Sequence, residues 1–392
     1  MPSPDCAPLH DALRAQVDQQ FLPGVSTALL RGRTVVDRWC YGDADREAQV
    51  ALRDDHLYRM FSNTKLVTSC AVMQLVEEGL IRLADPVEAY LPELDRLQVL
   101  RPGATRIDDT EPTHTSITIE HLMTHTSGLS YGLFDPGSLL FAAYNERRVR
   151  NPARPLADMV TALSTLPLSF HPGTAWEYSM ATDVLGRLIE VVRGQSFGEV
   201  IARRIFAPLG MVDTGFRVPQ SERHRLCALY VGADLADPTR PGLSRADDKP
   251  YPGAYLEDWP LESGGGGLVS SLDDTIRLVR SLLPDGDTLL RPETIEAMFH
   301  NRLPPHLCVR FPKLPRFTHR GFGLGSSVTL AAGPGEPDAI VGEVAWGGLA
   351  GTVWWINPRI GIAGVLMTQR WFGFENPFSY VFKREAYRAL GF

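Results

Sequence analysis

A serine and a lysine stand three residues apart, Ser62 and Lys65, directly before an apolar run at 66–76. Residues with this spacing lie on one face of a helix, so the two side chains can meet. A helix that is apolar nearly all round belongs inside the protein, where a hydroxyl and an amine are costly to bury unless they are paired. A serine beside an amine that can accept its proton is an activated nucleophile. Ser62 and Lys65 are therefore candidates for covalent catalysis.

Lysine is rare in this chain, which makes its place after Ser62 informative. It occurs only at positions 65, 249, 313 and 383, and the rest of the 39 basic residues are arginine. Arginine keeps its proton in a protein, whereas a desolvated lysine can lose it. A chance Ser-x-x-Lys is the alternative interpretation, and both the burial pattern and the scarcity of lysine weigh against it.

A tyrosine, Tyr178, stands just before a second helical pattern. Val184, Leu188 and Val192 lie on one face of that pattern, Ser179 could cap it, and Gly194 follows its end. The tyrosine can present its hydroxyl from a loop, although a half-buried tyrosine with no catalytic role is the ordinary case. Asp183, in the first turn, most simply complements the helix dipole. The alternative, functional interpretation is that the Asp183 carboxylate takes part in a hydrogen bond to an active centre.

Trp346, Gly347 and Gly348 precede a predicted hairpin. Glycines in a strand suggest that something approaches the backbone closely, and a substrate carbonyl that accepts from main-chain N–H groups would do so. A bulge beside a packed tryptophan is the alternative.

Taken together and in this order, the three motifs resemble the serine β-lactamase and penicillin-binding-protein superfamily, and most of all its class C-like esterases, the family VIII carboxylesterases. The resemblance implies that Ser62 is the nucleophile, that Lys65 and Tyr178 activate it, and that the N–H groups of Ser62 and Leu349 form an oxyanion hole. It also implies that Trp346, Gly347 and Gly348 bind substrate, with Asp183 in support. Other stretches that resemble this family lie at 121–129, 209–215, 264–270 and 321–325.

Two positions depart from the β-lactamase pattern. Those enzymes carry Lys-Thr-Gly or a similar basic motif where this chain has Trp346-Gly347-Gly348, so a cation for the lactam carboxylate is missing. The asparagine that commonly follows two residues after the tyrosine is Met180 here. Both differences favour a simple, less polar ester as substrate.

Two other motifs could mislead. Residues 128–132 match G-x-S-x-G around Ser130, but a nucleophile elbow needs a strand before the serine and a helix after it. Here a helical pattern precedes Ser130 and a turn follows it. His121 and His125 have the spacing of metal ligands on a helix, yet Leu122 replaces the glutamate of H-E-x-x-H and no third ligand stands out. The sequence predicts neither a metal nor a cofactor.

The elements around these motifs predict an α/β fold with an antiparallel sheet flanked by helices, of the β-lactamase and penicillin-binding-protein type. Strands are expected near both ends of the chain, and helices between them. Residues 1–86 and 216–392 are predicted to form one α/β domain and residues 87–215 an inserted helical domain, with the active site at their interface. The glycines at 264–267 are expected to be a flexible connector. The individual elements expected are helices at 9–17, 119–124, 159–166, 197–206, 273–283, 292–299 and 378–390, and strands at 25–30, 34–41, 353–356 and 360–368.

Composition narrows the functional classes. The 392 residues carry a net charge of −7 without a basic block, so nucleic acid is not an expected partner. There is no eighteen-residue apolar run for a membrane span and no signal-peptide pattern at the N-terminus. Five cysteines without a CxxC pair suggest reduced thiols and a cytoplasmic protein. The oligomeric state is left open.

The sequence thus predicts a serine esterase that hydrolyses short to medium acyl carboxylic esters through an acyl-enzyme on Ser62. A β-lactamase or D-peptidase and an acyltransferase remain alternatives, since both would use the same residues. A binding protein that has lost catalysis is the alternative from another class, and the intact Ser62, Lys65 and Tyr178 argue against it.

Overall fold

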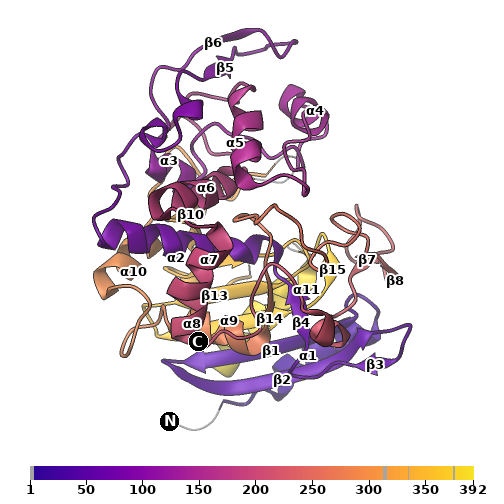
Figure 1. Ribbon diagram of the computed structural model, residues 1–392. Helices are drawn as coiled ribbons and strands as arrows, with labels where there is room; N and C mark the ends of the chain where they lie inside the picture. Colours follow the sequence, from indigo (N-terminus) through magenta and orange to yellow (C-terminus); the bar gives the residue numbers. More distant parts are fainter. Residues whose placement is uncertain (1–3, 312–315, 334, 374–375) are drawn as a thin grey trace.

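An eight-stranded sheet forms the base of the molecule. The computed structural model describes residues 4–311, 316–333, 335–373 and 376–392. All neighbouring strands of this sheet are antiparallel, and their order is β10-β11-β12-β13-β14-β1-β2-β3. Strands from the two ends of the chain lie side by side in it (Figure 1), which confirms the predicted antiparallel sheet. Its strands are β1 (Gly24–Arg31), β2 (Thr34–Asp45), β3 (Val50–Ala51), β10 (Arg320–Phe322), β11 (Ser327–Thr329), β12 (Val344–Gly347), β13 (Val353–Asn357) and β14 (Ile362–Met367).

Helices cover both faces of the sheet. Successive strand residues point to opposite faces, and in β1 Leu29 joins one apolar cluster whereas Ala28 and Leu30 join another. The Leu29 cluster contains residues of α1 (Ala7–Asp18) and α11 (Pro377–Ala389), which pack on each other. The larger cluster contains residues of α9 (Leu272–Arg280) and α2 (Thr64–Glu77). The central sheet is therefore buried on both sides.

The middle of the chain is mainly helical and lies above α2 in Figure 1. Helix α6 packs against α2, α3, α5 and α7 and so joins this region to α2. The boundaries at 87 and 215 stay a prediction. The helices of the middle and later chain are α3 (Ile119–Met123), α4 (Leu139–Glu146), α5 (Leu156–Ser164), α6 (Ala181–Arg193), α7 (Phe197–Ile201), α8 (Ala207–Leu209) and α10 (Pro292–Phe299).

Short elements complete the chain. A turn of π-helix, η4 (Ala202–Phe206), continues α7 in the region predicted as one short helix. The 3-10 turns are η1 (Phe61–Asn63), η2 (Val87–Ala89), η3 (Pro92–Leu94), η5 (Gln220–Arg225) and η6 (Asp338–Ile340). The small sheets contain β4 (Leu57–Arg59), β5 (Gln98–Leu100), β6 (Thr110–Pro112), β7 (Tyr230–Gly232), β8 (Leu243–Arg245), β9 (Val269–Ser271) and β15 (Arg370–Trp371).

The predicted cap of α6 is wrong by one residue. Its N-cap is Met180, and the Ser179 hydroxyl lies 3.1 Å from Nδ1 of His125 and accepts from the N–H of Ala181, the first helical residue, at 3.3 Å. At the other end, Gly194 adopts a φ of 64° and terminates the helix as predicted. The Ser179 hydroxyl is thus shared between the start of the helix and a tertiary hydrogen bond to His125.

The prediction of a flexible connector at 264–267 is also wrong. A Cβ atom on Gly264 would lie 2.7 Å from the carbonyl oxygen of Thr182, and one on Gly265 would lie 2.5 Å from a carboxylate oxygen of Asp183. The Thr68 hydroxyl donates to the Gly264 carbonyl at 2.7 Å. These glycines serve close packing of the loop between α2 and α6.

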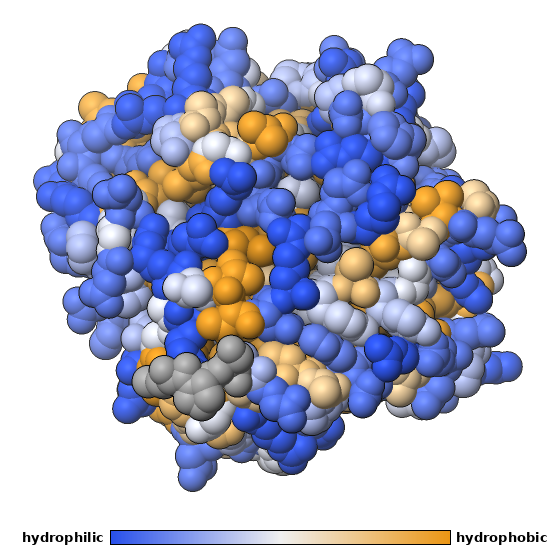
Figure 2. Space-filling view, turned by 90° about the horizontal axis from the view of Figure 1, so that it is seen from below, coloured by the Kyte–Doolittle hydropathy of each residue, from blue (hydrophilic) through white to orange (hydrophobic). Residues whose placement is uncertain are grey.

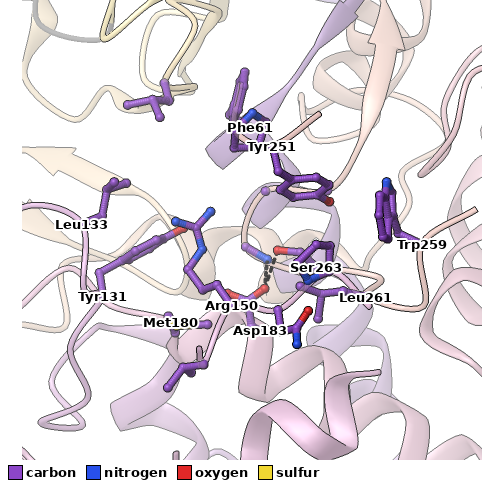
Figure 3. Close-up of a pocket in the computed structure, with 18 of the residues that line it drawn as sticks. Phe61, Tyr131, Leu133, Arg150, Met180, Asp183, Tyr251, Trp259, Leu261 and Ser263 are labelled. Atoms are coloured by element: carbon purple, nitrogen blue, oxygen red, sulfur yellow. Dashed lines mark hydrogen bonds between the residues drawn. The ribbon is translucent and has the colours of Figure 1, made fainter. Parts of the chain in front are cut away.

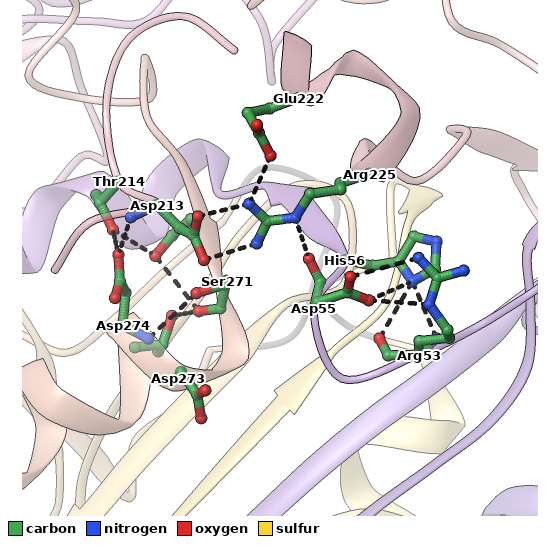
Figure 4. Close-up of polar contacts among 12 residues, drawn as sticks. Arg53, Asp55, His56, Asp213, Thr214, Glu222, Arg225, Ser271, Asp273 and Asp274 are labelled. Carbon is green, nitrogen blue, oxygen red and sulfur yellow. Dashed lines mark hydrogen bonds and ion pairs between the residues drawn. The ribbon is translucent and has the colours of Figure 1, made fainter. Parts of the chain in front are cut away.

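Arg225 ties together segments that are distant in sequence (Figure 4). Its guanidinium donates to both carboxylate oxygens of Asp213 at 2.8 and 2.7 Å and to the carbonyl of Asp55 at 2.7 Å. The backbone N–H of Asp213 and the hydroxyl of Thr214 both donate to Asp274, in the first turn of α9. The segment before β4, the loop after α8 and helix α9 are therefore linked by charge-assisted hydrogen bonds.

The face seen from below is mostly hydrophilic, and its hydrophobic residues form separate groups (Figure 2). Across the described ranges, no helix combines the length and the apolar character that crossing a membrane requires.

Candidate active site

Ser62 lies on a strained turn at the start of α2. The sequence predicts that the helix opens on this serine, whereas α2 begins at Thr64 and Ser62 lies in the preceding 3-10 turn. Phe61 has a φ of 44°, in the left-handed region where a non-glycine residue costs roughly 1–3 kcal/mol. Its ring packs edge-on against Tyr255 and Trp371, with centroids 5.7 and 5.4 Å apart. This packing holds the turn that presents Ser62.

The three residues predicted to act together do meet. The Tyr178 hydroxyl donates to Oγ of Ser62 at 2.6 Å, and Nζ of Lys65 lies 3.5 Å from the same oxygen. Nζ of Lys65 also donates to the carbonyl oxygen of Gly265 at 2.7 Å. Ser62 Oγ is therefore within reach of both a phenol and an amine.

The surroundings of Lys65 favour its neutral form. The side chain is almost fully buried, at 1% exposure, and burial lowers its pKa below the ordinary 10.5. Tyr131 and Asp183 oppose this shift, whereas the Arg150 cation adds to it. Because the pKa is lowered, a larger fraction of the amine is neutral at a given pH, and the neutral amine can accept a proton.

Tyr178 sits in an aromatic cage. Burial raises its pKa well above the ordinary value, so its hydroxyl keeps the proton at neutral pH. The Trp346 indole N–H donates to that hydroxyl at 3.3 Å. The rings of Tyr131 and His125 lie with their centroids 5.4 and 4.9 Å from the Tyr178 ring. The cage fixes the phenol and suits it to donate or relay a proton.

Asp183 supports the site through the loop that contains the glycines at 264–267, the glycine loop. It is 3% exposed and accepts from the backbone N–H of Gly265 and from the Ser263 hydroxyl, as the dashed lines in Figure 3 show. The carbonyl of Gly265 in turn accepts from Lys65. Asp183 is therefore a positioning residue for the loop that holds the lysine.

Two backbone N–H groups are available beside Ser62. Neither the N–H of Ser62 nor that of Leu349 has a hydrogen-bond acceptor among the described residues. Both residues line the cavities at the serine. Unpaired main-chain donors next to a nucleophile are the arrangement that stabilises an oxyanion.

The residues of the Trp346 motif differ in what they contact. Trp346 and Gly347 line the smaller of the two cavities at Ser62. A Cβ on Gly348 would lie 2.4 Å from the carbonyl oxygen of Met60. The backbone that approaches Gly348 closely is thus that of the protein itself, so the glycine is explained by packing.

Ser62 and Leu349 line two cavities of different character. The smaller, of about 70 Å³, is mostly aromatic and apolar. The larger, of about 440 Å³, contains tyrosines, tryptophans and charged residues (Figure 3). Its volume is that of a typical small-molecule site. The smaller cavity is lined by Ser62, Phe134, Tyr178, Phe311, Trp346, Gly347 and Leu349.

The two misleading motifs have structural roles. The N–H of Ser130 donates to the Tyr144 hydroxyl at 3.0 Å, and Ser130 lines neither cavity at Ser62. His121 accepts from the backbone N–H of Thr118 in the capping box of α3. His125 is engaged with Ser179. The histidine pair is therefore not arranged as a metal site.

One cluster elsewhere combines possible metal ligands. Glu111, His114 and His171 have side-chain ligand atoms within 4.8 Å of one another. Glu111 belongs to β6, and none of the three lines a cavity at Ser62. The cluster has no part in the chemistry at the serine.

Sequence reasoning missed Tyr131 and Arg150. Tyr131 stacks on Tyr178 and lies 5.4 Å from Nζ of Lys65. It is the residue after Ser130. The G-x-S-x-G motif at 128–132 thus lies in a loop that contributes to the active site, although Ser130 is not its nucleophile. Arg150 lies in a proline-rich loop and carried no signal that separates it from the many other arginines of the chain.

Comparisons with known proteins show the family to which the chain belongs. The Beta-lactamase family model matches residues 9–387. An uncharacterized protein of Mycobacterium tuberculosis is 34% identical over 356 residues, which cover 88% of this chain and 86% of that protein. Esterase EstB of Burkholderia gladioli is 31% identical over 400 residues, covering 98% and 96%. The structure of EstCE1, a hydrolase with promiscuous acyltransferase activity, superposes with a TM-score of 0.79 at 23% identity and covers 97% of both chains.

Proposed function

The chain belongs to the β-lactamase family of serine hydrolases, and we propose that it is a serine esterase of the family VIII type that hydrolyses short to medium acyl carboxylic esters. One observation carries the proposal. Ser62, Lys65 and Tyr178 form a single hydrogen-bonded group beside the main-chain N–H groups of Ser62 and Leu349, which have no acceptor in the part of the chain that the structure describes. The fold supports it as well, since the sheet and its helices are those of the β-lactamase and penicillin-binding-protein type.

Acylation begins with proton transfer from Ser62. Neutral Lys65 accepts the proton while Oγ of Ser62 bonds to the ester carbonyl carbon. The N–H groups of Ser62 and Leu349 stabilise the resulting oxyanion, and such donors are each worth about 3 kcal/mol. The ester C–O bond then breaks, and the alcohol leaves with the proton of the Tyr178 hydroxyl, which Lys65 replaces.

Deacylation uses the same groups in reverse. A water molecule attacks the acyl carbon and gives a proton to the Lys65 and Tyr178 pair. The bond to Ser62 breaks, Ser62 regains its proton, and the carboxylic acid leaves. Because coupled groups share protons, the two side chains act as one base here.

Esters are favoured over β-lactams for two reasons. The Trp346 motif offers no cation for a lactam carboxylate, and Met180 stands where β-lactamases commonly place an asparagine. EstB, an esterase, is similar over almost the whole chain. An acyltransferase is a second candidate, because the fold also occurs in EstCE1, a hydrolase with promiscuous acyltransferase activity.

Comparison of substrate classes tests the proposal. We expect turnover of p-nitrophenyl butyrate with a kcat/KM at least 100-fold above that for nitrocefin, and loss of ester turnover by about 10³-fold or more in Ser62→Ala. Ser130→Ala is the matched control and should retain activity. Product analysis with a competing alcohol should show mainly the free acid.

Faster turnover of nitrocefin would support the β-lactamase alternative, and transfer of most acyl groups to the alcohol would support the acyltransferase. Undiminished ester turnover by Ser62→Ala would contradict the assignment of the nucleophile.

The proposed cellular setting follows from the thiols. All five cysteines are free, which supports a cytoplasmic location, and the proposed partner is a small-molecule ester. Fractionation of cells that produce the tagged protein tests the location.

A further inference from the structure

Arg150 brings an unmatched positive charge to the larger cavity. Its guanidinium carbon lies 5.3 Å from the ring centroid of Tyr131, and Figure 3 shows the side chain reaching into the cavity beside that ring. Arg150 is exposed and lines the cavity. Within the described ranges, no carboxylate lies close enough to form an ion pair with it. An arginine held over a tyrosine face with a free planar fork can bind an anion.

The charge of Arg150 reaches the centre of the site. It lowers the pKa of Lys65 further after burial has lowered it. It also opposes the rise in pKa that burial causes at Tyr131, Tyr178 and Tyr255. Of these four groups, Lys65 and Tyr178 contact Ser62, and Tyr131 and Tyr255 line the larger cavity. Because Ser62 and Arg150 line that same cavity, an anion at Arg150 would lie near the nucleophile.

The four carboxylates that line the same cavity have other partners. Asp183 accepts from the glycine loop, and Glu262 accepts from the backbone N–H of Gly198 at 2.7 Å. Glu257 and Asp258 lie 3.5 and 3.7 Å from other arginines. None of the four forms an ion pair with Arg150, and a second arginine, Arg148, also lines the cavity, so positive charge is available there to a ligand.

The two cavities differ in their relation to the leaving group. In the proposed mechanism, the Tyr178 hydroxyl protonates the departing alcohol. Tyr178 lines the smaller cavity and is not among the residues that line the larger one. The alcohol part of the ester is therefore assigned to the smaller cavity, and the acyl part to the larger cavity with Arg150.

We propose that this protein prefers esters whose acyl part carries a carboxylate, such as monoesters of a dicarboxylic acid, and that Arg150 binds that carboxylate. The inference rests on the proposed esterase function. The cation that the Trp346 motif lacks is thus supplied by Arg150, which lines the larger cavity at Ser62. The less polar ester expected from the sequence is thus replaced by one with an anionic acyl part, and the apolar cavity receives the alcohol.

Arg150 affects both Lys65 and the substrate, and two variants separate these effects. Arg150→Lys keeps the positive charge near Lys65 but loses the planar fork that binds a carboxylate through two hydrogen bonds. Arg150→Gln loses both. We therefore expect Arg150→Gln alone to move the acid limb of kcat/KM to higher pH, because loss of the cation raises the pKa of Lys65.

The test compares two chromogenic esters of equal chain length, mono-p-nitrophenyl glutarate and p-nitrophenyl pentanoate, after subtraction of spontaneous hydrolysis. We expect the wild-type protein to have about tenfold higher kcat/KM for the glutarate ester, which is within the range for a charge-assisted hydrogen bond. Arg150→Gln should remove this preference and Arg150→Lys should reduce it. Arg154→Gln is the matched control, since Arg154 is exposed in the same loop and lies outside the cavity.

Calorimetry of glutarate binding to Ser62→Ala measures the affinity of the anion site without turnover. Adding Arg150→Gln to this variant should weaken glutarate binding about tenfold. Equal kcat/KM values for the two esters in the wild-type protein, or an equal loss for both in Arg150→Gln, would overturn the inference. If neither ester is turned over but glutarate binding depends on Arg150, the esterase proposal fails and the anion site stands.

Discussion

At the scale of single residues, the chemistry depends on how one amine is buried. Lys65 is 1% exposed, and its closest acceptor is the carbonyl of Gly265. No carboxylate forms an ion pair with it within the described part of the chain. Burial is the first cause of its lowered pKa, and the Arg150 cation adds to it. The sequence identified the lysine through its spacing and rarity, but Tyr131 and Arg150 meet it only after folding and could not be predicted from local patterns.

The lysine gives a pH dependence with a definite sign. Protonated Lys65 cannot accept the Ser62 proton, and its neutral fraction grows as pH rises. We therefore expect kcat/KM for a neutral ester to rise with pH through an apparent pKa below 10.5. Lys65→Arg, which stays protonated at all accessible pH values, should lose about 10²–10⁴-fold in kcat/KM.

The matched control is Lys249→Arg, because Lys249 is exposed and pairs with Asp248. It should keep the wild-type profile. A flat profile, or wild-type rates in Lys65→Arg, would show that another group takes the proton.

At the scale of elements, the site depends on the contact between α2, α6 and the glycine loop at 264–267. Both helices were predictable from local signals: α2 from a run that is apolar nearly all round, and α6 from apolar periodicity and the glycine at its end, Gly194. The close packing of the loop was not predictable, because a run of four glycines indicates flexibility when the residues that pack against it are unknown. The reason for the glycines is the closeness of Thr182 and Asp183, which lie about 80 residues earlier in the chain.

Gly265→Ala tests this packing. The new Cβ would lie 2.5 Å from a carboxylate oxygen of Asp183, so the loop must move and its carbonyl must shift from Lys65. We expect a loss of more than tenfold in kcat/KM and a decrease of about 1–3 kcal/mol in the free energy of unfolding, as for other overpacked sites.

Denaturant unfolding and ester turnover measure the two effects. Gly137→Ala is the control, since a Cβ there meets nothing within 4 Å. Unchanged stability and turnover in Gly265→Ala would mean that the loop is not held by close packing.

At the scale of the whole molecule, both ends of the chain build the sheet, and the middle contributes part of the lining of the larger cavity. Hydrophobic patterns predicted the terminal strands, the hairpin of β13 and β14, and helix α11. Strand order, the two cavities and the network around Arg225 arise from contacts over long sequence separations, and no local pattern encodes them. The resemblance to a family supplied the pairing of Ser62 with Tyr178, and the structure supplied its distance.

The central claim is that Ser62 is the residue that becomes acylated. The most direct measurement is mass-spectrometric mapping of the protein after reaction with a p-nitrophenyl alkylphosphonate, which bonds to an activated serine and releases p-nitrophenol. We predict one stoichiometric adduct on the peptide that contains Ser62, present in Ser130→Ala and absent in Ser62→Ala. An adduct on any other residue, or ester turnover by a protein that forms no adduct, would contradict the account.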